Sequence, residues 1–264
     1  MSGLGTAIRA EIRRHLAILV AYPVDNIAWL AMTCLLFLAL VTILDGASGG
    51  AYGKEDQVLT MVGWLTFQIG GGYVDHISRS VSDEAESGTL EQICLSPIPL
   101  AVVFIARSTV YLVIASVRGV IAALILALVV GILPINTSLV GLFLVSLPGA
   151  CGLGLALAGL ALVFKRTKAL TGLAFGLMIF LTGAFVGLEK IGWLFTATQM
   201  LLPLTWAISL MRTTFTSDVT LSTLCSSGEL LGLLLHSLVY LMIGIAGFVL
   251  GYRIARRKGT LAHY

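Results

Sequence analysis

Residues 27–44 read IAWLAMTCLLFLALVTIL and contain no charged side chain. An uninterrupted apolar stretch of this length matches the roughly 20 residues that an α-helix needs to cross the hydrocarbon core of a bilayer. Because hydrocarbon offers the backbone no hydrogen-bond partner, such a segment satisfies its own N–H and C=O groups by forming a helix. The stretch therefore predicts an integral membrane protein built from α-helices.

The rest of the chain repeats this pattern. Of its 264 residues, 58% are hydrophobic and 11% are charged, whereas soluble domains are roughly one-quarter charged. We expect a single transmembrane domain, 1–264, with six crossings. The predicted spans are 27–44, 58–74, part of the run 100–133, 139–164, 169–188 and 230–250.

Residues 1–23 precede the first span and are expected to form a helix that lies in the membrane interface. Apolar residues recur there at helical spacing, while Arg9, Arg13 and Arg14 occupy the other side. The same charges interrupt what would be the apolar core of a cleavable signal peptide. Pro23 is expected to turn the chain into the membrane.

The segment 189–228 is expected to dip into the membrane from the exterior without crossing it. Its part 191–215 is apolar but is interrupted at Pro203. A seventh crossing would place the basic tail 253–258 outside, against the positive-inside rule. Six crossings place both termini in the cytoplasm, in a plasma or inner membrane.

Glycine pairs at a spacing of four residues predict close helix packing in lipid. They are Gly172 with Gly176, Gly183 with Gly187, and Gly247 with Gly251. A contact between two subunits and packing within one subunit fit this spacing equally well. The four scattered cysteines indicate neither a disulfide framework nor a metal site, and the net charge of +3 indicates no nucleic-acid surface.

The acidic part of the segment 75–99 is the most informative polar stretch. Gly88 suits the end of one helix, Thr89 with Gln92 has the spacing of a capping box, and Pro97 would end the helix that follows. A short cytoplasmic helix with apolar and acidic side chains can dock on a basic partner, although the pattern alone fits an ordinary solvated loop helix as well. The candidate docking residues are Asp83, Glu84, Glu86, Gly88, Thr89, Leu90, Glu91 and Gln92.

The run ESGTLEQ at 86–92, followed by Ser96-Pro97, resembles the signature of the ABC-2 type transporter permease family, the membrane subunits of type-2 ABC exporters. The segment 203–206, PLTW, and Met211-Arg212 before the last span are also similar, so the resemblance extends over essentially the whole chain. Ile93-Cys94 replaces a leucine pair that is often found in the family.

The resemblance implies a fold in which the helix at 86–92, the coupling helix, inserts into a groove of a separate ATPase subunit. It implies two ATPase copies, which bind ATP and magnesium, and a second permease subunit, identical or homologous. This chain would bind no cofactor and would itself be no enzyme, since its nearest approach to a phosphate loop, 48–55, lacks the required residues. The substrate would be amphipathic, lipid-linked or drug-like and would move out of the cytoplasm.

Arg118 lies near the middle of the predicted third span, where an arginine costs at least about 2.5 kcal/mol. It could line the substrate path and meet an anionic group, or it could be compensated by a structural partner. An ion-coupled secondary transporter or a channel that uses Arg118 and 191–215 is an alternative function. A membrane-embedded enzyme is a weaker one, because no cluster of His, Asp or Glu appears at a predicted bilayer surface.

Overall fold

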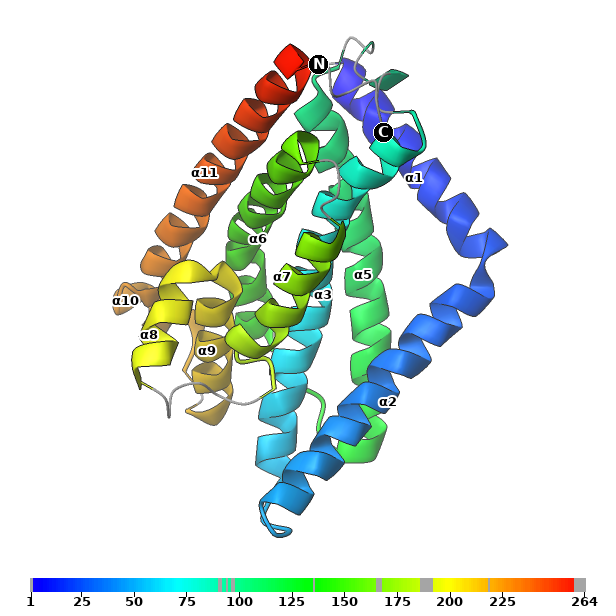
Figure 1. Cartoon of the computed structure of the whole chain (residues 1–264). Coiled ribbons are helices and arrows are strands. Elements are labelled where there is room, and N and C mark those ends of the chain that lie inside the picture. The colour runs from blue at the N-terminus through cyan, green and yellow to red at the C-terminus, as the bar shows by residue number, and fades with distance from the viewer. Residues whose placement is uncertain are drawn as a thin grey trace.

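The computed structural model describes residues 2–89, 92–93, 95, 98–134, 136–164, 168–185, 192–217 and 219–258. In these ranges the regular structure is helical, and the long helices stand side by side in one bundle (Figure 1). The helices are α1 (Ser2–Ala21), α2 (Pro23–Ala47), α3 (Lys54–Glu86), α5 (Leu100–Val130), α6 (Thr137–Val163), α7 (Lys168–Leu181), α8 (Gly192–Leu201), α9 (Pro203–Thr216), α10 (Leu221–Ser226) and α11 (Glu229–Lys258).

Four of these helices, α2, α5, α6 and α11, are long and apolar enough to cross a membrane. They contain the predicted first, third, fourth and sixth spans. The predicted second span lies in α3, whose second half is polar, and the predicted fifth lies partly in α7, which is short. The all-helical membrane fold is confirmed, while the count of six crossings stays a prediction.

The predicted end of the second span at Val74 is not the end of its helix, because α3 continues to Glu86. One turn of this extension is closed by Arg79, whose Nε donates to both carboxylate oxygens of Asp75 at 2.6 and 2.8 Å. On another side Ile77 is fully buried. A polar face with internal ion pairs and a buried apolar face together sustain the helix beyond its apolar half.

Two other helices end before the apolar stretches that contain them, and in both cases a left-handed glycine follows closely. α5 ends at Val130, within the apolar run 100–133, because Gly131 adopts φ +86° and caps it in the left-handed conformation. α7 ends at Leu181, within the predicted span 169–188, and Gly183 adopts φ +70°, while residues 186–188 of that span lie outside the described residues. A left-handed residue stops a helix whatever the hydropathy of the chain that follows.

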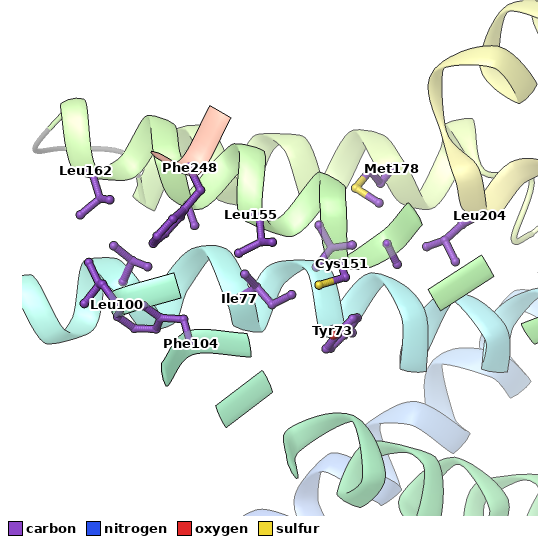
Figure 2. Packing of buried hydrophobic residues seen from close by; sticks show 14 of the residues in the cluster. Tyr73, Ile77, Leu100, Phe104, Cys151, Leu155, Leu162, Met178, Leu204 and Phe248 are labelled. Atoms are coloured by element: carbon purple, nitrogen blue, oxygen red, sulfur yellow. The ribbon is translucent and has the colours of Figure 1, made fainter. Parts of the chain in front are cut away.

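The main core of the bundle forms around α3. Side chains from α3, α5, α6, α7, α9 and α11 meet there, as Figure 2 shows for Ile77, Phe104, Leu155 and Phe248. All four expose 2% of their surface or less. In a membrane this packing replaces contacts with lipid chains, so close fit between side chains holds the helices together.

The closest helix pair is α6 with α11, and glycine makes the approach possible. A Cβ added at Gly244 or Gly251 of α11 would collide with the carbonyl of Gly152 or Gly159 of α6. Of the predicted pair Gly247/Gly251, Gly251 therefore serves packing within one subunit, whereas a Cβ at Gly247 would only touch Ala156 at 3.8 Å. By contrast, a Cβ at Gly176 of α7 would meet nothing within 4 Å.

The structure has a helix in the N-terminal segment 1–23, and its position in the membrane interface stays a prediction. α1 reaches Ala21, and Pro23 is the first residue of α2, where a proline needs no hydrogen-bonding N–H. The two helices meet at a corner that projects from the bundle, while the beginning of α1 returns to α5 (Figure 1). The beginning of α1 and the ends of α3 and α11 lie at the same, upper, end of the bundle in Figure 1.

We predict that Gly244→Ala destabilises the protein by about 1–3 kcal/mol, because the new methyl group overpacks the α6–α11 contact. Thermal unfolding in detergent measures the effect. Gly176→Ala is the matched control, since the same change at an open helical position has little effect or stabilises by up to about 1 kcal/mol. Equal melting temperatures for the two variants would contradict the packing described.

Candidate functional site

The junction after α3 contains the residues that are predicted to dock on a partner. Gly88 adopts φ +71°, and the Thr89 N–H donates to the Glu84 carbonyl at 3.1 Å. This hydrogen bond, which spans a left-handed glycine, is that of a Schellman motif at a helix C-terminus. The prediction that Gly88 suits the end of a helix is confirmed.

Thr89 connects the junction back to α3. Its hydroxyl donates to the Glu84 carboxylate and lies 2.9 Å from the Ser87 hydroxyl. Gln92 and Ile93 are helical, and the Ile93 N–H donates to the Thr89 carbonyl at 3.2 Å. The capping-box spacing is thus accompanied by a backbone hydrogen bond from Ile93 to Thr89, but the threonine hydroxyl is engaged by the preceding helix.

Glu84 is buried, with 9% of its surface exposed, and belongs to a cluster of charges from three helices. Arg107 of α5 donates from Nη1 to Glu84 Oε1 at 2.5 Å and from Nε to Oε1 of Glu11, on α1, at 3.0 Å. We call Glu11, Glu84 and Arg107 the ionic junction. It connects the N-terminal helix and α5 to the last turn of α3.

The charges of the ionic junction compensate one another in a buried site. Burial raises the pKa of Glu84, but the hydrogen bonds from Thr89 and Arg107 outweigh it, so the pKa lies below its ordinary value. The ring centroid of Phe104 lies 5.6 Å from Arg107 Cζ and adds a cation–π contact. Glu84 is thus held ionised, and its carboxylate is already engaged inside the chain.

Most of the other described docking candidates are exposed, in contrast to the buried Glu84. Asp83, Glu86 and Gln92 are exposed, and Leu95 exposes 86% of its surface just beyond them. We call these four residues the docking face. Leu90 and Glu91, which the sequence also nominates, lie outside the described residues.

Arg107 and Glu11 are site residues that the sequence patterns did not predict. Two signals could have identified them. Arg107 interrupts an apolar run at 100–133, where a charge needs a compensating partner, and Glu11 is the single acid in the arginine-rich segment 1–23. Neither signal says which residues pair, because Glu11 and Arg107 are 96 residues apart.

Arg118 has a structural partner on α2. Its Nη2 donates to the side-chain carbonyl of Asn26, and its Cζ lies 5.8 Å from the centroid of the Trp29 ring. Its buried Nε finds no hydrogen-bond partner among the described residues. The pairing with an uncharged amide on a neighbouring helix is the type of compensation expected of a structural arginine, and contact with a substrate stays a prediction.

The end of α7 and the residues just after it lie against α9, which donates to two of their carbonyl groups. Thr205 donates to the Leu181 carbonyl at 3.2 Å, and Arg212 Nη2 donates to the Ala184 carbonyl at 3.3 Å. Arg212 is buried, at 8% exposed. The carbonyl end of a helix favours a positive charge, and here the chain supplies its own.

The end of α8 is satisfied in the same way by α11. Nε2 of His236 lies 2.9 Å from the Met200 carbonyl, and the Tyr240 hydroxyl donates to the Leu201 carbonyl at 2.6 Å. The break between α8 and α9 falls at Pro203, as predicted. His236 is thus a hydrogen-bonded histidine at the end of an interrupted helix.

Most of the chain is similar to a known family of membrane transporters. Residues 6–216 match the family model described as ABC-2 type transporter. The match covers more than half of the chain, so the chain belongs to this family. No curated protein matches it.

We predict that Arg107→Met destabilises the protein by about 3–5 kcal/mol, because two buried carboxylates lose their shared cation. Equilibrium unfolding in detergent measures the loss. Arg253→Met, at an exposed position on α11, is the matched control and should stay within about 0.5 kcal/mol of the wild type. Adding Glu11→Gln and Glu84→Gln to Arg107→Met should restore much of the stability, and no recovery would contradict the pairing.

We predict that Arg118→Leu destabilises the protein by about 1.5–3 kcal/mol, the usual contribution of a hydrogen bond to a charged group. Asn26→Leu combined with Arg118→Leu should cost less than the sum of the two single changes. Thermal unfolding of the four proteins gives the coupling. If Arg118→Leu folds normally but transport per folded molecule falls, the arginine acts in the substrate path instead.

Proposed function

We propose that this ABC permease subunit works as an exporter and that its docking face binds a separate ATPase. The ionic junction then transmits the movement of the ATPase to the membrane helices. Membership of the ABC-2 type transporter family implies an ABC ATPase as partner. The observation that supports the docking role is a difference between neighbouring side chains at the end of α3. Glu84 and Thr89 are engaged inside the chain, while acidic and apolar side chains a few residues away are exposed.

The docking face has the composition expected of a surface that meets a basic groove. Asp83 and Glu86 supply negative charge, and Leu95 supplies an exposed apolar side chain. Leu90 and Glu91 are included in the proposed surface on the strength of the family resemblance. Complementary charge steers association and excludes wrong partners, while the apolar contact adds affinity.

Glu84 receives a positioning role rather than a contact with the partner. It accepts hydrogen bonds from Thr89 and from Arg107, so the junction, α5 and α1 are linked through one carboxylate. When the ATPase subunits close on ATP, a push on the docking face reaches α5 and α1 through these bonds. The permease then rearranges around a path that it shares with a second, identical or homologous, subunit.

The distribution of charge supports a cytoplasmic position for the upper end of the bundle. The positive-inside rule assigns the arginine-rich side to the cytoplasm. α1 begins and α3 and α11 finish at this end, whereas α3 begins with Lys54 at the other (Figure 1). The described arginines at or near the upper end are Arg9, Arg13, Arg14, Arg79, Arg107, Arg253, Arg256 and Arg257.

The proposed assembly moves an amphipathic, lipid-linked or drug-like substrate out of the cytoplasm through a plasma or inner membrane. Two ATPase copies bind ATP and magnesium. Both termini of the permease lie in the cytoplasm. The long apolar helices supply the passage, and the partner supplies the chemistry.

We predict that Glu86→Lys combined with Glu91→Lys weakens binding of the partner ATPase at least tenfold, because like charges facing a basic groove cost several kcal/mol. Binding of the purified ATPase to the permease in nanodiscs measures the loss. Glu55→Lys combined with Glu229→Lys makes the same charge change at two exposed positions at the starts of α3 and α11, and should bind like the wild type.

Two results would contradict the proposal. Unchanged ATPase binding by the Glu86→Lys, Glu91→Lys protein would remove the docking role. Labelling of a Glu86→Cys variant by a membrane-impermeant thiol reagent in intact cells, with Cys225→Ser as background to remove an exposed native thiol, would place the docking face on the wrong side of the membrane.

A further inference from the structure

A polar cavity of about 290 Å³ lies between α1, α3 and α5 at the upper end of the bundle. From α1 it is lined by Arg14, His15 and Ile18, and from α5 by Arg107 and Tyr111. The lining residues from α3 are Gly72, Asp75, His76, Arg79, Ser80, Asp83 and Glu84. It therefore adjoins the ionic junction but extends beyond it along α3.

Two of the three arginines in the cavity are closely paired with carboxylates. Arg79 Nε donates to both oxygens of Asp75, and Arg107 Nη1 donates to Glu84 at 2.5 Å. Arg14 is held differently. Its Nη1 lies 3.7 Å from Glu84 Oε1 and 3.9 Å from Glu11 Oε2, too far for a hydrogen bond to either carboxylate, and its side chain is 51% exposed. Arg14 thus keeps donors available on the cavity wall.

His76 adds a second polar group to the wall. Its ring stacks on the ring of Tyr111, with centroids 4.0 Å apart and planes 11° from parallel, and the ring of His15 lies 6.1 Å away. The stacking fixes the imidazole of His76 in place. Its buried Nδ1 has no hydrogen-bond partner among the residues that the structure describes, and a buried polar atom without a partner costs about 1–3 kcal/mol.

The place of the cavity in the fold favours a membrane lipid as the source of such a partner. α1 forms one wall, and its apolar Ile18 is 44% exposed at the cavity. Arg9 and Arg13 lie on the same helix and are exposed. Basic pockets between transmembrane helices on the cytoplasmic side bind phosphate-bearing lipid head groups, which an arginine-rich interfacial helix also attracts.

We propose that the polar cavity binds the phosphate of a phospholipid from the adjoining leaflet, with Arg14 and His76 as its donors. Arg14 makes a charge-assisted hydrogen bond to a phosphate oxygen, which is stronger than a neutral one. The imidazole of His76 donates through Nδ1, and the acyl chains leave past Ile18. The bound lipid holds α1 against α3. The inference rests on the proposed function only in that the upper end lies in the cytoplasmic leaflet.

The test is native mass spectrometry of the full-length permease, purified in detergent and incubated with dioleoylphosphatidylglycerol, dioleoylphosphatidylethanolamine or dioleoylglycerol. We expect one retained phospholipid per chain and much weaker retention of dioleoylglycerol, which has the same acyl chains without phosphate. Arg14→Gln should lower phospholipid affinity about tenfold, which corresponds to roughly 1.4 kcal/mol. His76→Phe, which keeps an aromatic ring against Tyr111, should lower it about threefold.

Arg253→Gln is the matched control, because it removes an exposed arginine from α11 without touching the cavity. It should retain phospholipid like the wild type. Equal retention of dioleoylglycerol, or unchanged retention by both Arg14→Gln and His76→Phe, would overturn the proposal. Displacement of the phospholipid by millimolar inorganic phosphate would assign the cavity to the free ion instead of a lipid.

Binding of the partner ATPase to the same preparations separates this inference from the proposed function. A permease that binds the ATPase but shows no selectivity for phospholipid would overturn the lipid site and leave the exporter function intact. A permease that retains phospholipid through Arg14 but binds no ATPase would overturn the proposed function and leave the lipid site intact. If Arg14→Gln lowers the melting temperature, the loss of affinity in His76→Phe decides the outcome.

Discussion

The arrangement of the upper end depends on one buried cation. The charged side chain of Arg107 is buried, with 7% of the residue exposed. It is paired with the carboxylates of Glu11 and Glu84, which belong to two other helices. Their pairing fixes α1 and the last turn of α3 relative to α5. Because the last turn of α3 is fixed, the left-handed turn at Gly88 and the exposed acidic residues before it, Asp83 and Glu86, are also held in place.

At the other end of the bundle the governing constraint is the backbone. The last carbonyl groups of a helix have no partner within that helix, and hydrocarbon offers them none. An interrupted helix in a membrane is therefore stable only if other side chains supply donors. Arg212 and Thr205 do so for α7, and His236 and Tyr240 do so for α8.

Local patterns in the sequence predicted much of this fold. The apolar stretches identify the membrane helices, Pro23 and Pro203 mark two breaks, and Gly88 marks the end of α3. The limits of the predicted spans do not coincide with the ends of α3, α5 and α7, because hydropathy reports how far an apolar surface extends and not where the hydrogen-bonded helix stops. Polar residues lengthened α3, and left-handed glycines shortened α5 and α7.

The sequence by itself determined that the chain is an all-helical membrane protein of the ABC-2 type transporter family, since apolar length and a short motif are properties of contiguous residues. Only the tertiary structure decided which acids point inward. Glu84 and Glu86 are two residues apart in one acidic run, yet Glu84 is buried against Arg107 while Glu86 is exposed. Side chains two positions apart on a helix point to different sides, and the partner that selects one of them comes from a distant part of the chain.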